Sequence, residues 1–547
     1  MKNIFKLKKI FLLLAVITLF ISGCKDEELL FGADRLFRPI ITPVTVSGTW
    51  MRLEWDRYKD VSNYELDLSV DTFKTIYNSF KTDSAQITIK NLDYDTNYQI
   101  RLRAIGDSII STGDSIKSEY YIFSISTLDY PTQLKTPTSA DVIDKSIRVK
   151  WNVTALPYSR IDVMVSKDSV YKTVILNETE NLAGERIISG LQPATSYIVK
   201  IYSGENDYKG KKTFNTVSSQ IFEGDVVDLR DYSDEEAKNM ITQTFVDSLA
   251  ILYPNGFNMV LSGGTSYAMP TVNLPVSMNI VTGLSFKGKA MLAVNGGFGI
   301  TAASNIGKIR FEKIFFTEGT VAGKFKTDGN YGGTYVFNMN QANGNVESMI
   351  FEGCDIKYKR GVIRMQTSAN INKLTINNCL IDSIGGYGVV NNGNDASYIG
   401  DIVVTNSTVL NADKVFVCGK ALGIKSIIVE KVTTCYSPNG TGSYLFDYNG
   451  NTIPGGLSVK DCLFGVGKTE TVNGMRSAST SISFDNCFKT SDLMWTINPT
   501  TLLPSYPIND LTDLGKTAAM IFVNPAASNF KVTESTLVNK VGDPRWW

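Results

Sequence analysis

The chain has no histidine among its 547 residues, and this absence excludes several kinds of site. Ser-His-Asp and Cys-His triads, histidine general bases and histidine-ligated metals all need an imidazole. A net charge is also missing, because 54 Lys and Arg residues balance 54 Asp and Glu residues. The overall charge therefore does not indicate nucleic acid as a partner. Any catalysis would have to use Arg, Lys, Tyr or carboxylates.

Long apolar runs are scarce as well. Residues 10–21 form an apolar segment that is too short to span a bilayer, which takes about 20 apolar residues. Four lysines precede it within residues 2–9, and small residues follow it in Ile21-Ser22-Gly23-Cys24. This order is typical of a signal peptide, predicted here over residues 1–23. No later stretch is long and apolar enough to span a membrane.

The small residues before Cys24 resemble the lipobox of bacterial lipoproteins. The resemblance implies cleavage before Cys24 and lipid on its thiol, and several acyl chains make a lasting membrane anchor. The following Lys25-Asp26-Glu27-Glu28 resembles the surface-export tag of Bacteroidota lipoproteins. It implies an outer-membrane protein that faces the cell exterior, with residues 24–37 as an acidic tether. An ordinary secretory signal with a chance cysteine stays open as the alternative.

Two similar modules follow, and frequent glycine and β-branched residues indicate strands. The first has Trp55 on an early strand and Tyr98 before a late one, and the second repeats this pattern with Trp151 and Tyr197. A buried Trp and a Tyr at a strand corner resemble fibronectin type III sandwiches, in which the Tyr hydroxyl bonds back to backbone near the corner. We assign these modules to residues 38–128 and 129–217, with a role as spacers.

Residues 233–250 carry the pattern of a helix. Ser233 and Glu236 form a capping-box sequence, and an apolar side follows it. A single helix before a long β region indicates a lid over the end of a solenoid. Residues 218–254 are therefore predicted to be a linker and capping helix.

From residue 255 the chain repeats apolar residues at offsets 0 and +2 of each unit and core residues at +5 and +7, with Lys489 departing at the last position of the seventh unit. The first residues of the seven units are Ile309, Met349, Leu374, Ile402, Ile427, Leu457 and Ile482. Two short inward-facing strands joined at a corner bury nothing alone, but stacked rungs bury a continuous core. With a third strand per unit, residues 255–547 resemble the right-handed parallel β-helix of pectate lyases. The closing segment, which ends in Gly542-Asp543-Pro544-Arg545-Trp546, resembles an uncharacterised Bacteroidota β-helix family that is often encoded among polysaccharide-utilisation genes.

The predicted fold class is thus all-β, with two fibronectin type III-like β-sandwiches followed by a right-handed parallel β-helix with an N-terminal capping helix. Cysteines occupy one core position in four rungs, where we expect buried free thiols. They are Cys354, Cys379, Cys462 and Cys487. Asn378, Asn406 and Asn486 occupy the corner, where a left-handed backbone and an asparagine ladder are expected.

The outer face of the third strand is the expected ligand groove, by resemblance to pectate lyases. If Val336, Ile363, Val390, Phe416 and Leu445 point inward, their neighbours point outward. The candidate ligand-binding residues are then Tyr335, Phe337, Arg364, Asn391, Tyr444, Phe446 and Tyr448. Aromatic faces stack on sugar rings, and an arginine fork suits a uronate carboxylate. The alternative is that these aromatic side chains are covered by loops or by an insertion over 317–333.

A pectate-type lyase would need carboxylates that hold calcium, together with an Arg or Lys base such as Arg364. Asp447 is the acid on the third strands, and its parity predicts an inward side chain. Asp382, Asp395 and Asp401 lie near one loop and are the remaining candidates for a metal site. No cofactor is predicted, except Ca²⁺ if the protein is a lyase.

The sequence therefore favours a surface lipoprotein that captures plant polysaccharide, of acidic and pectic type, for uptake. An outer-membrane uptake complex is a possible further partner, and nucleic acid is not expected. A calcium-dependent pectate-type polysaccharide lyase is the first alternative. An adhesin or structural stalk that binds a protein partner is the second.

Overall fold

The computed structural model describes residues 36–109, 114–166, 169–318, 334–418, 423–438, 443–496 and 507–547. The signal segment and Cys24 lie outside the described residues. The chain divides into two compact units. The first contains the two sandwiches, and the second contains the β-helix with its cap and tail.

The first sandwich has a three-stranded and a five-stranded sheet. The smaller sheet is ordered β1 (Ile41–Val46), β2 (Trp50–Trp55), β5 (Gln86–Lys90). The larger contains β3 (Val61–Ser69), β4 (Asn78–Thr82), β6 (Asn97–Ile109), β7 (Ser115–Lys117) and β8 (Tyr121–Ser126). Trp55 and Tyr98 are buried between the sheets, and the Asp93 amide donates to the Tyr98 hydroxyl over 3.0 Å. This is the corner expected of a fibronectin type III sandwich.

The second sandwich repeats the arrangement with two sheets. One pairs β9 (Ser146–Lys150) with β12 (Glu185–Ser189), which follows α2 (Glu178–Ala183). The other is ordered β11 (Ser169–Ile175), β10 (Arg160–Ser166), β13 (Ser196–Ser203), β14 (Asp207–Asn215). Trp151 and Tyr197 are buried, as the sequence pattern predicts.

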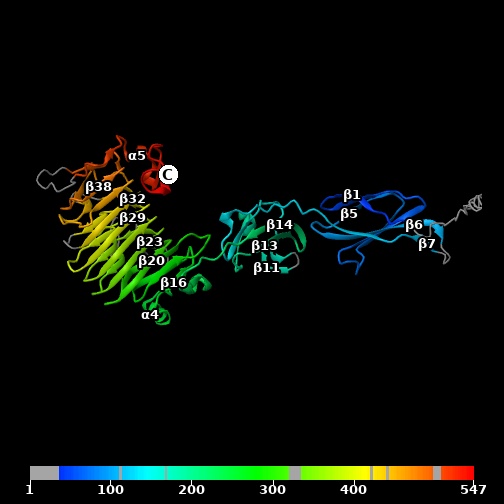
Figure 1. The fold of residues 1–547 in the computed structure, drawn as a ribbon, viewed down its shortest axis with the longest axis horizontal. Helices are drawn as coiled ribbons and strands as arrows, with labels where there is room; N and C mark the ends of the chain where they lie inside the picture. Colours follow the sequence, from blue (N-terminus) through cyan, green and yellow to red (C-terminus); the bar gives the residue numbers. More distant parts are fainter. Residues whose placement is uncertain are drawn as a thin grey trace, which may run out of the picture. The chain divides into compact units, whose positions relative to one another are not determined.

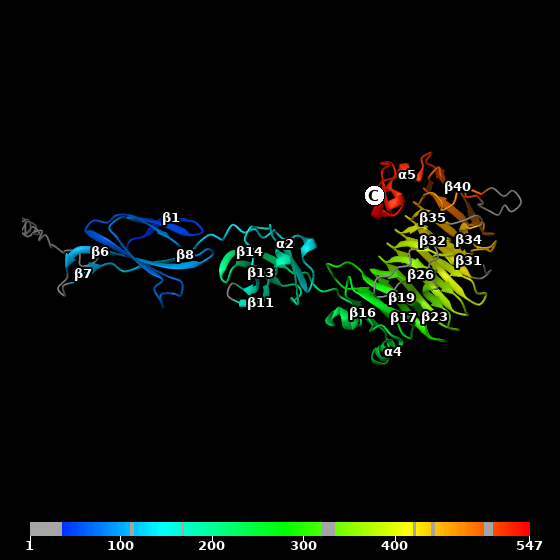
Figure 2. The same ribbon diagram turned by 180° about the vertical axis from the view of Figure 1, so that it is seen from behind.

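The β-helix stacks its coils in parallel register, which Figures 1 and 2 show from opposite sides. The first strands of the coils form a ten-stranded sheet. It contains β15 (Asp225–Asp228), β16 (Phe257–Leu261), β18 (Met278–Thr282), β20 (Asn305–Glu312), β23 (Asn345–Glu352), β26 (Asn370–Asn377), β29 (Tyr398–Thr405), β32 (Ile424–Glu430), β35 (Leu457–Lys460) and β38 (Ile482–Asp485).

The second and third strands form one continuous network of 17 strands. The second strands are β21 (Ile314–Thr317), β24 (Asp355–Lys359), β27 (Leu380–Ile384), β30 (Thr408–Leu410), β33 (Thr433–Cys435), β36 (Leu463–Phe464), β39 (Phe488–Lys489) and β41 (Thr512–Asp513). The third strands are β22 (Tyr335–Met339), β25 (Gly361–Met365), β28 (Val390–Asn392), β31 (Phe416–Cys418), β34 (Tyr444–Asp447), β37 (Thr471–Arg476) and β40 (Met494–Trp495). In the first two coils β17 (Ser266–Leu274) and β19 (Ala290–Ile300) run along both positions.

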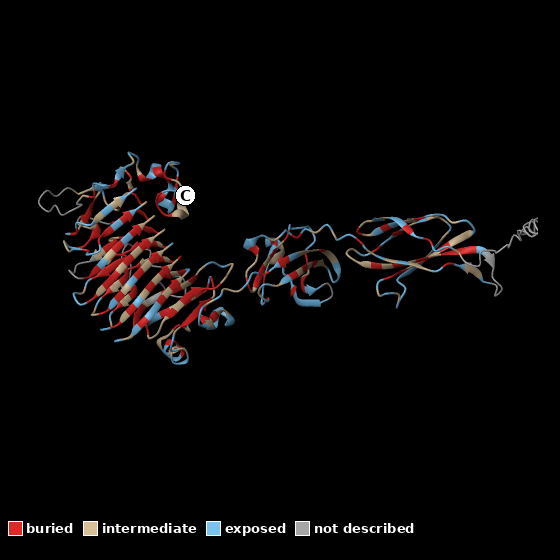
Figure 3. Ribbon diagram, viewed as in Figure 1, coloured by how far each residue is buried: buried red, intermediate tan, exposed pale blue. Residues whose placement is uncertain are grey.

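The predicted repeat is confirmed in register. Ile309 pairs with Met349, and the chain of pairs continues through Leu374, Ile402, Ile427 and Leu457 to Ile482. The four predicted core cysteines are buried free thiols. Figure 3 shows the alternation of buried and more exposed residues along these strands. The core is therefore one continuous apolar column inside the coils.

The corner asparagines adopt the predicted left-handed backbone, with φ near +50° at Asn378, Asn406 and Asn486. The expected ladder differs in detail. Asn406 Nδ2 donates over 2.8 Å to Asn377, one residue before the corner below, and Asn486 donates to Asp461. Asn378 Oδ1 instead accepts from Arg545 of the closing segment.

The predicted helix over 233–250 is two helices, α3 (Asp234–Ala237) and α4 (Gln243–Leu252). The Ser233 capping box is present. The single-helix prediction was wrong because Thr242 starts a new helix, its hydroxyl accepting from the Phe245 amide. Ile241 between them is fully buried and packs, with residues of both helices, on the first coils. The segment thus covers the end of the core, as expected of a cap.

The C-terminal tail returns along the outside of the second strands. It contains α5 (Ala518–Ile521), β42 (Phe522–Asn524) and β43 (Asn529–Val532), and it ends at a short turn, η4 (Pro544–Trp546). Its apolar residues form a separate cluster with Leu410, Cys435 and Leu463 of three successive coils. Asp543 is 1% exposed and accepts from the Thr408 hydroxyl over 2.6 Å and from the Arg545 amide over 3.0 Å.

Asp543→Ala should weaken this docking. The substitution removes the acceptor of the buried Thr408 hydroxyl and the ion-pair partner of the Arg545 guanidinium, 3.0 Å away. We therefore expect the β-helix to lose about 3 kcal/mol of stability. Denaturant unfolding measures the loss. Asp510→Ala, at an exposed tail position, is the matched control and should change little. Equal unfolding of both variants would contradict the assigned role of Asp543.

Candidate functional site

The pairing register of the third strands fixes which residues face inward. Phe337 pairs with Ile363, and the row continues through Val390 and Phe416 to Phe446. All are buried in the core. The expected outward orientation of Phe337 and Phe446 was therefore wrong. In these two coils the adjacent residues, Val336 and Leu445, are also apolar and buried. The alternation of side chains along the strand therefore could not indicate which of the two neighbours points inward.

The neighbouring row faces outward. It contains Asn338, Arg364, Asn391, Val417 and Asp447, in pairing order. Arg364 and Asn391 thus lie on the predicted face, although Asn391 is only 7% exposed. Asp447 was expected to point inward, but it belongs to this row. Its carboxylate forms an ion pair over 2.7 Å with Arg476 of the next coil.

The two predicted tyrosines at the far end of this face differ from each other. Tyr444 is half-buried, and the Arg476 guanidinium lies 4.9 Å from its ring centre. Tyr448 is 1% exposed and belongs to the core, so its expected outward orientation was wrong. It lies beyond the end of β34, where the strand parity used for the prediction no longer applies.

A small cavity of about 150 Å³ opens at the near end of the same face. Tyr335 and Asn338 line it from β22, and Arg364 lines it from β25. Arg360, in the turn before β25, and Asn273 of β17 complete its polar wall. We call this cavity the arginine pocket. The structure thus brings together two of the predicted site residues, Tyr335 and Arg364, and adds three that the sequence pattern did not indicate.

The two arginines are held by aromatic rings. The Arg364 guanidinium lies 5.2 Å from the ring centres of Tyr335 and Tyr387, and the Arg360 guanidinium lies 4.2 Å from that of Tyr387. The two rings meet edge to face. Among the described residues, no carboxylate lies within ion-pair distance of either guanidinium. The site therefore carries two positive charges that no described acid neutralises, in positions already ordered by cation–π contacts.

Several buried oxygens in the arginine pocket have no hydrogen-bond partner among the described residues. They are Asn273 Oδ1, Asn338 Oδ1 and the Tyr335 hydroxyl. Each such group lowers the free energy of unfolding by about 1–3 kcal/mol unless water or a ligand supplies a hydrogen-bond partner. Burial raises the pKa of Tyr335 to about 12, so its hydroxyl stays protonated at neutral pH. The pocket thus offers two cations, two amide acceptors and one phenol.

Gly299 makes room for this arrangement. A Cβ at this position would lie 2.5 Å from Asn273 Oδ1 and 3.1 Å from the Asn338 carbonyl oxygen. Any side chain would therefore displace the amide that lines the pocket. The combination of cations, acceptors and close backbone suits an anionic ligand that also carries hydroxyl donors.

A buried lysine stands behind the pocket wall. Lys359 is fully buried, and its ammonium lies 3.3 Å from the Glu318 carboxylate and 2.5 Å from the hydroxyl of Thr334. Burial lowers the pKa of Lys359 to about 8, although Glu318 opposes this shift. Thr334 lines the arginine pocket, so this network positions part of its wall.

The three aspartates considered for a metal do not meet. Asp382, on β27, is paired with Lys357 over 3.2 Å and accepts from Asn411. Asp401 is on β29 of the ten-stranded sheet, where the Ser426 hydroxyl lowers its pKa, and Asp395 is exposed in the preceding turn. The grouping was wrong because the coil separates these residues onto different faces. In the described part of the chain, no group of three acidic or cysteine residues could hold a metal ion.

Comparisons with known proteins add little on function. Residues 427–546 match a family described as "Domain of unknown function (DUF5123)". No curated protein matches the chain. A two fibronectin type-III domain segment from chicken tenascin is similar at 19% identity, covering 32% of this chain and 99% of that one, with a TM-score of 0.18. Within the described residues, no helix has the length and apolarity needed to cross a bilayer.

The buried lysine makes stability depend on pH in a defined direction. Folded Lys359 releases its proton near pH 8, whereas the unfolded residue keeps it until about pH 10.5. The unfolded state therefore binds more protons in this window, and the stability of the wild type relative to Lys359→Met should rise by up to about 3 kcal/mol across it. Denaturant unfolding of both proteins at several pH values measures this difference. A constant difference would contradict the lowered pKa of Lys359.

Proposed function

We propose that this protein is a cell-surface glycan-binding lipoprotein that captures acidic plant polysaccharide, of pectic type, through the arginine pocket. The observation that carries the proposal is the pair of arginines, Arg360 and Arg364, that no described carboxylate neutralises. A uronate carboxylate would pair with these guanidinium groups. Its hydroxyls would donate to the two unpartnered amide oxygens of Asn273 and Asn338.

The chemistry of the pocket favours a charged sugar over an uncharged one. The two fixed guanidinium cations repel metal ions and bind anions. The buried amide oxygens beside them accept hydrogen bonds from hydroxyl groups. The tyrosine rings hold the guanidinium groups before the ligand arrives, so little side-chain order is lost on binding. The ligand would need an anion and hydroxyl donors in one compact unit, and a uronate ring combines them.

The described outward row of the third strands does not offer the carboxylates that a calcium-dependent lyase requires. A calcium-dependent lyase needs several carboxylates around the metal. Within the described outward row, from Asn338 to Asp447, the acid present is Asp447, and it is occupied by Arg476. Arg364 could still act as a base, so the reaction product is measured directly in the binding experiment. The alternative of an adhesin or structural stalk that binds a protein partner predicts a broad exposed apolar patch on the β-helix or on the sandwiches, which we assign as spacers.

The place of the protein at the cell exterior rests on its sequence. The Cys24 lipobox and the acidic residues after it support a lipid anchor in the outer membrane. In a Bacteroidota polysaccharide-utilisation system, such an anchor would place the β-helix where polymer reaches it before uptake through an outer-membrane complex.

Arg364→Ala should reduce affinity for polygalacturonate by about 10- to 100-fold, the value of a charge-assisted hydrogen bond of about 1.5–3 kcal/mol. Arg364→Lys should recover only part of it, because an ammonium cannot form a two-pronged contact. Affinity electrophoresis and titration calorimetry measure the change. Arg52→Ala, on an exposed strand of the first sandwich, is the control and should bind as the wild type does.

The same mixtures distinguish binding from cleavage. Ultraviolet absorbance of unsaturated uronates should stay at background with the wild-type protein and calcium. A rise that Arg364→Ala abolishes would establish the lyase and overturn the binding proposal. Equal retention of wild type and Arg364→Ala would remove the arginine pocket from the ligand site.

Cys24→Ser should release the protein from membranes, because serine has no thiol to carry the diacylglycerol. Cell fractionation and incorporation of labelled fatty acid measure the anchor. Ser22→Ala keeps a small residue before the cleavage site and serves as the control. A Cys24→Ser protein that stays labelled and membrane-bound would contradict lipidation at this residue.

A further inference from the structure

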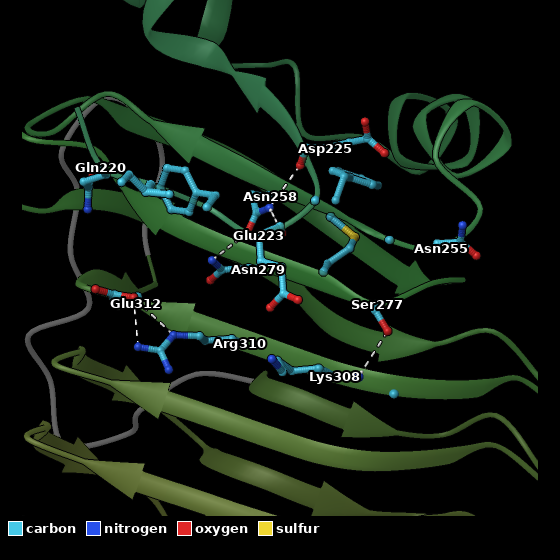
Figure 4. Close-up of a pocket in the computed structure, with 17 residues that line it drawn as sticks. Gln220, Glu223, Asp225, Asn255, Asn258, Ser277, Asn279, Lys308, Arg310 and Glu312 are labelled. Atoms are coloured by element: carbon cyan, nitrogen blue, oxygen red, sulfur yellow. Dashed lines mark hydrogen bonds and ion pairs between the residues drawn. The ribbon is translucent and has the colours of Figure 1, made fainter. Parts of the chain in front are cut away.

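A second and larger cavity lies on another face of the β-helix. It has a volume of about 870 Å³, and its floor is the outer surface of β16, β18 and β20 in the ten-stranded sheet (Figure 4). Its wall is the segment 220–225, which runs into β15. We call this cavity the amide groove. It shares no lining residue with the arginine pocket.

In one outward row of the ten-stranded sheet, amide and guanidinium side chains occur in the three strands that form the floor of the amide groove. Asn258, Asn279 and Arg310 occupy one outward row in three successive strands. The same row continues outside the groove with Ile350, Thr375, Val403 and Ile428. The change from amide and guanidinium to β-branched side chains in this row coincides with the end of the cavity, so Asn258, Asn279 and Arg310 are associated with the groove.

The hydrogen bonds of this floor leave defined acceptors open. Asn258 is saturated, since its Nδ2 donates to the carbonyls of Glu223 and Asp225 and its Oδ1 accepts from Asn279. Asn279 Oδ1 is buried and has no partner among the described residues. Gln220 Oε1, in the wall, is in the same state. Water or the hydrogen-bond donors of a ligand can satisfy these acceptors, at two separate points of the groove.

The charges of the groove do not select an anion. Three carboxylates, Glu223, Asp225 and Glu312, line it together with two cations, Lys308 and Arg310. Arg310 is paired with Glu312 over 2.9 Å. The excess of one negative charge disfavours the uronate that suits the arginine pocket. An uncharged ligand with both donors and acceptors fits this mixture, and sugar hydroxyls provide both.

The groove also offers apolar contact but no free strand edge. Phe222 is half-buried in the wall, and Ile221 beside it is 95% exposed. Their carbon surfaces can pack on the carbon faces of sugar rings. Each floor strand is already hydrogen-bonded to a strand on both sides, from β15 to β23, so a peptide could not add as a further strand here.

We propose that the amide groove is a second carbohydrate site, which takes an uncharged glycan segment. Asn279 and Gln220 accept from its hydroxyls, Lys308 donates to its ring or hydroxyl oxygens, and Phe222 packs on a sugar face. The proposal goes beyond the acidic-glycan function of the arginine pocket and does not depend on it, because the two sites differ in residues and in charge.

The test measures affinity of the full chain for linear galactan, arabinan and xyloglucan, with polygalacturonate in parallel. Asn279→Leu removes the open acceptor, and Phe222→Ala removes the apolar wall while keeping the asparagine pair. Each should reduce affinity for the uncharged polymer that the wild type binds by at least tenfold. Thr375→Ala, in the same row but outside the groove, is the matched control and should bind as the wild type does.

The outcomes separate this proposal from the function of the arginine pocket. Loss of uncharged-glycan binding with unchanged unfolding midpoints supports the groove, whatever happens with polygalacturonate. The proposal would be overturned if the wild type bound no uncharged polymer. It would also be overturned if both groove variants bound the uncharged polymer as tightly as the wild type does. Retention of synthetic peptides and of no polysaccharide would also overturn it.

Discussion

The stacking of parallel rungs is the constraint on which the rest of the β-helix depends. Each strand bonds to the same position one coil above and below, so a residue type placed once is repeated along a row. Inward rows become a continuous apolar column, from Ile309 to Ile482 in the ten-stranded sheet. Outward rows become surfaces whose chemistry changes only where the sequence of successive coils changes. Both candidate sites lie where the side chains of an outward row change in this way from one coil to the next.

The same constraint explains what the sequence could and could not predict. Offsets of two and five residues repeat through seven coils, so the core and the cysteine positions followed from the pattern alone. In the third strand, adjacent residues such as Val336 and Phe337 are both buried. The sequence then does not show which of two adjacent apolar residues points inward, and Phe337, Phe446 and Tyr448 were assigned outward in error. Tyr387 contacts Arg364 from a glycine-flanked turn, and Asn273 lines the arginine pocket from an early coil. Their spacing in the sequence carries no signal of that proximity.

Stability and binding compete within the arginine pocket. Buried acceptors and arginine charges that have no partner in the described part of the chain both disfavour the folded state, yet the surrounding structure keeps them in place. The tyrosine rings partly offset the charge of Arg360 and Arg364, and Gly299 allows the strands to approach the Asn273 amide closely. The buried Lys359–Glu318 pair holds Thr334 at the edge of the pocket at a further cost in desolvation. The burial of the apolar column and of the docked tail stabilises the fold and offsets the free-energy cost of the arginine pocket.

Two sites of different charge on separate faces of one β-helix have a consequence for the ligand. In the proposed function the arginine pocket selects an anion. The amide groove has one excess negative charge and two acceptors without partners among the described residues. A polysaccharide with charged and uncharged segments would engage both, and the second contact would form at the high local concentration set by the first. Each site could then be weak alone while the pair retains polymer firmly. Weak individual contacts also release ligand readily, which would suit the proposed capture of polymer for transfer rather than for storage. A lipid anchor at Cys24 would serve the same end, because it would keep a captured polysaccharide at the surface where the proposed uptake begins.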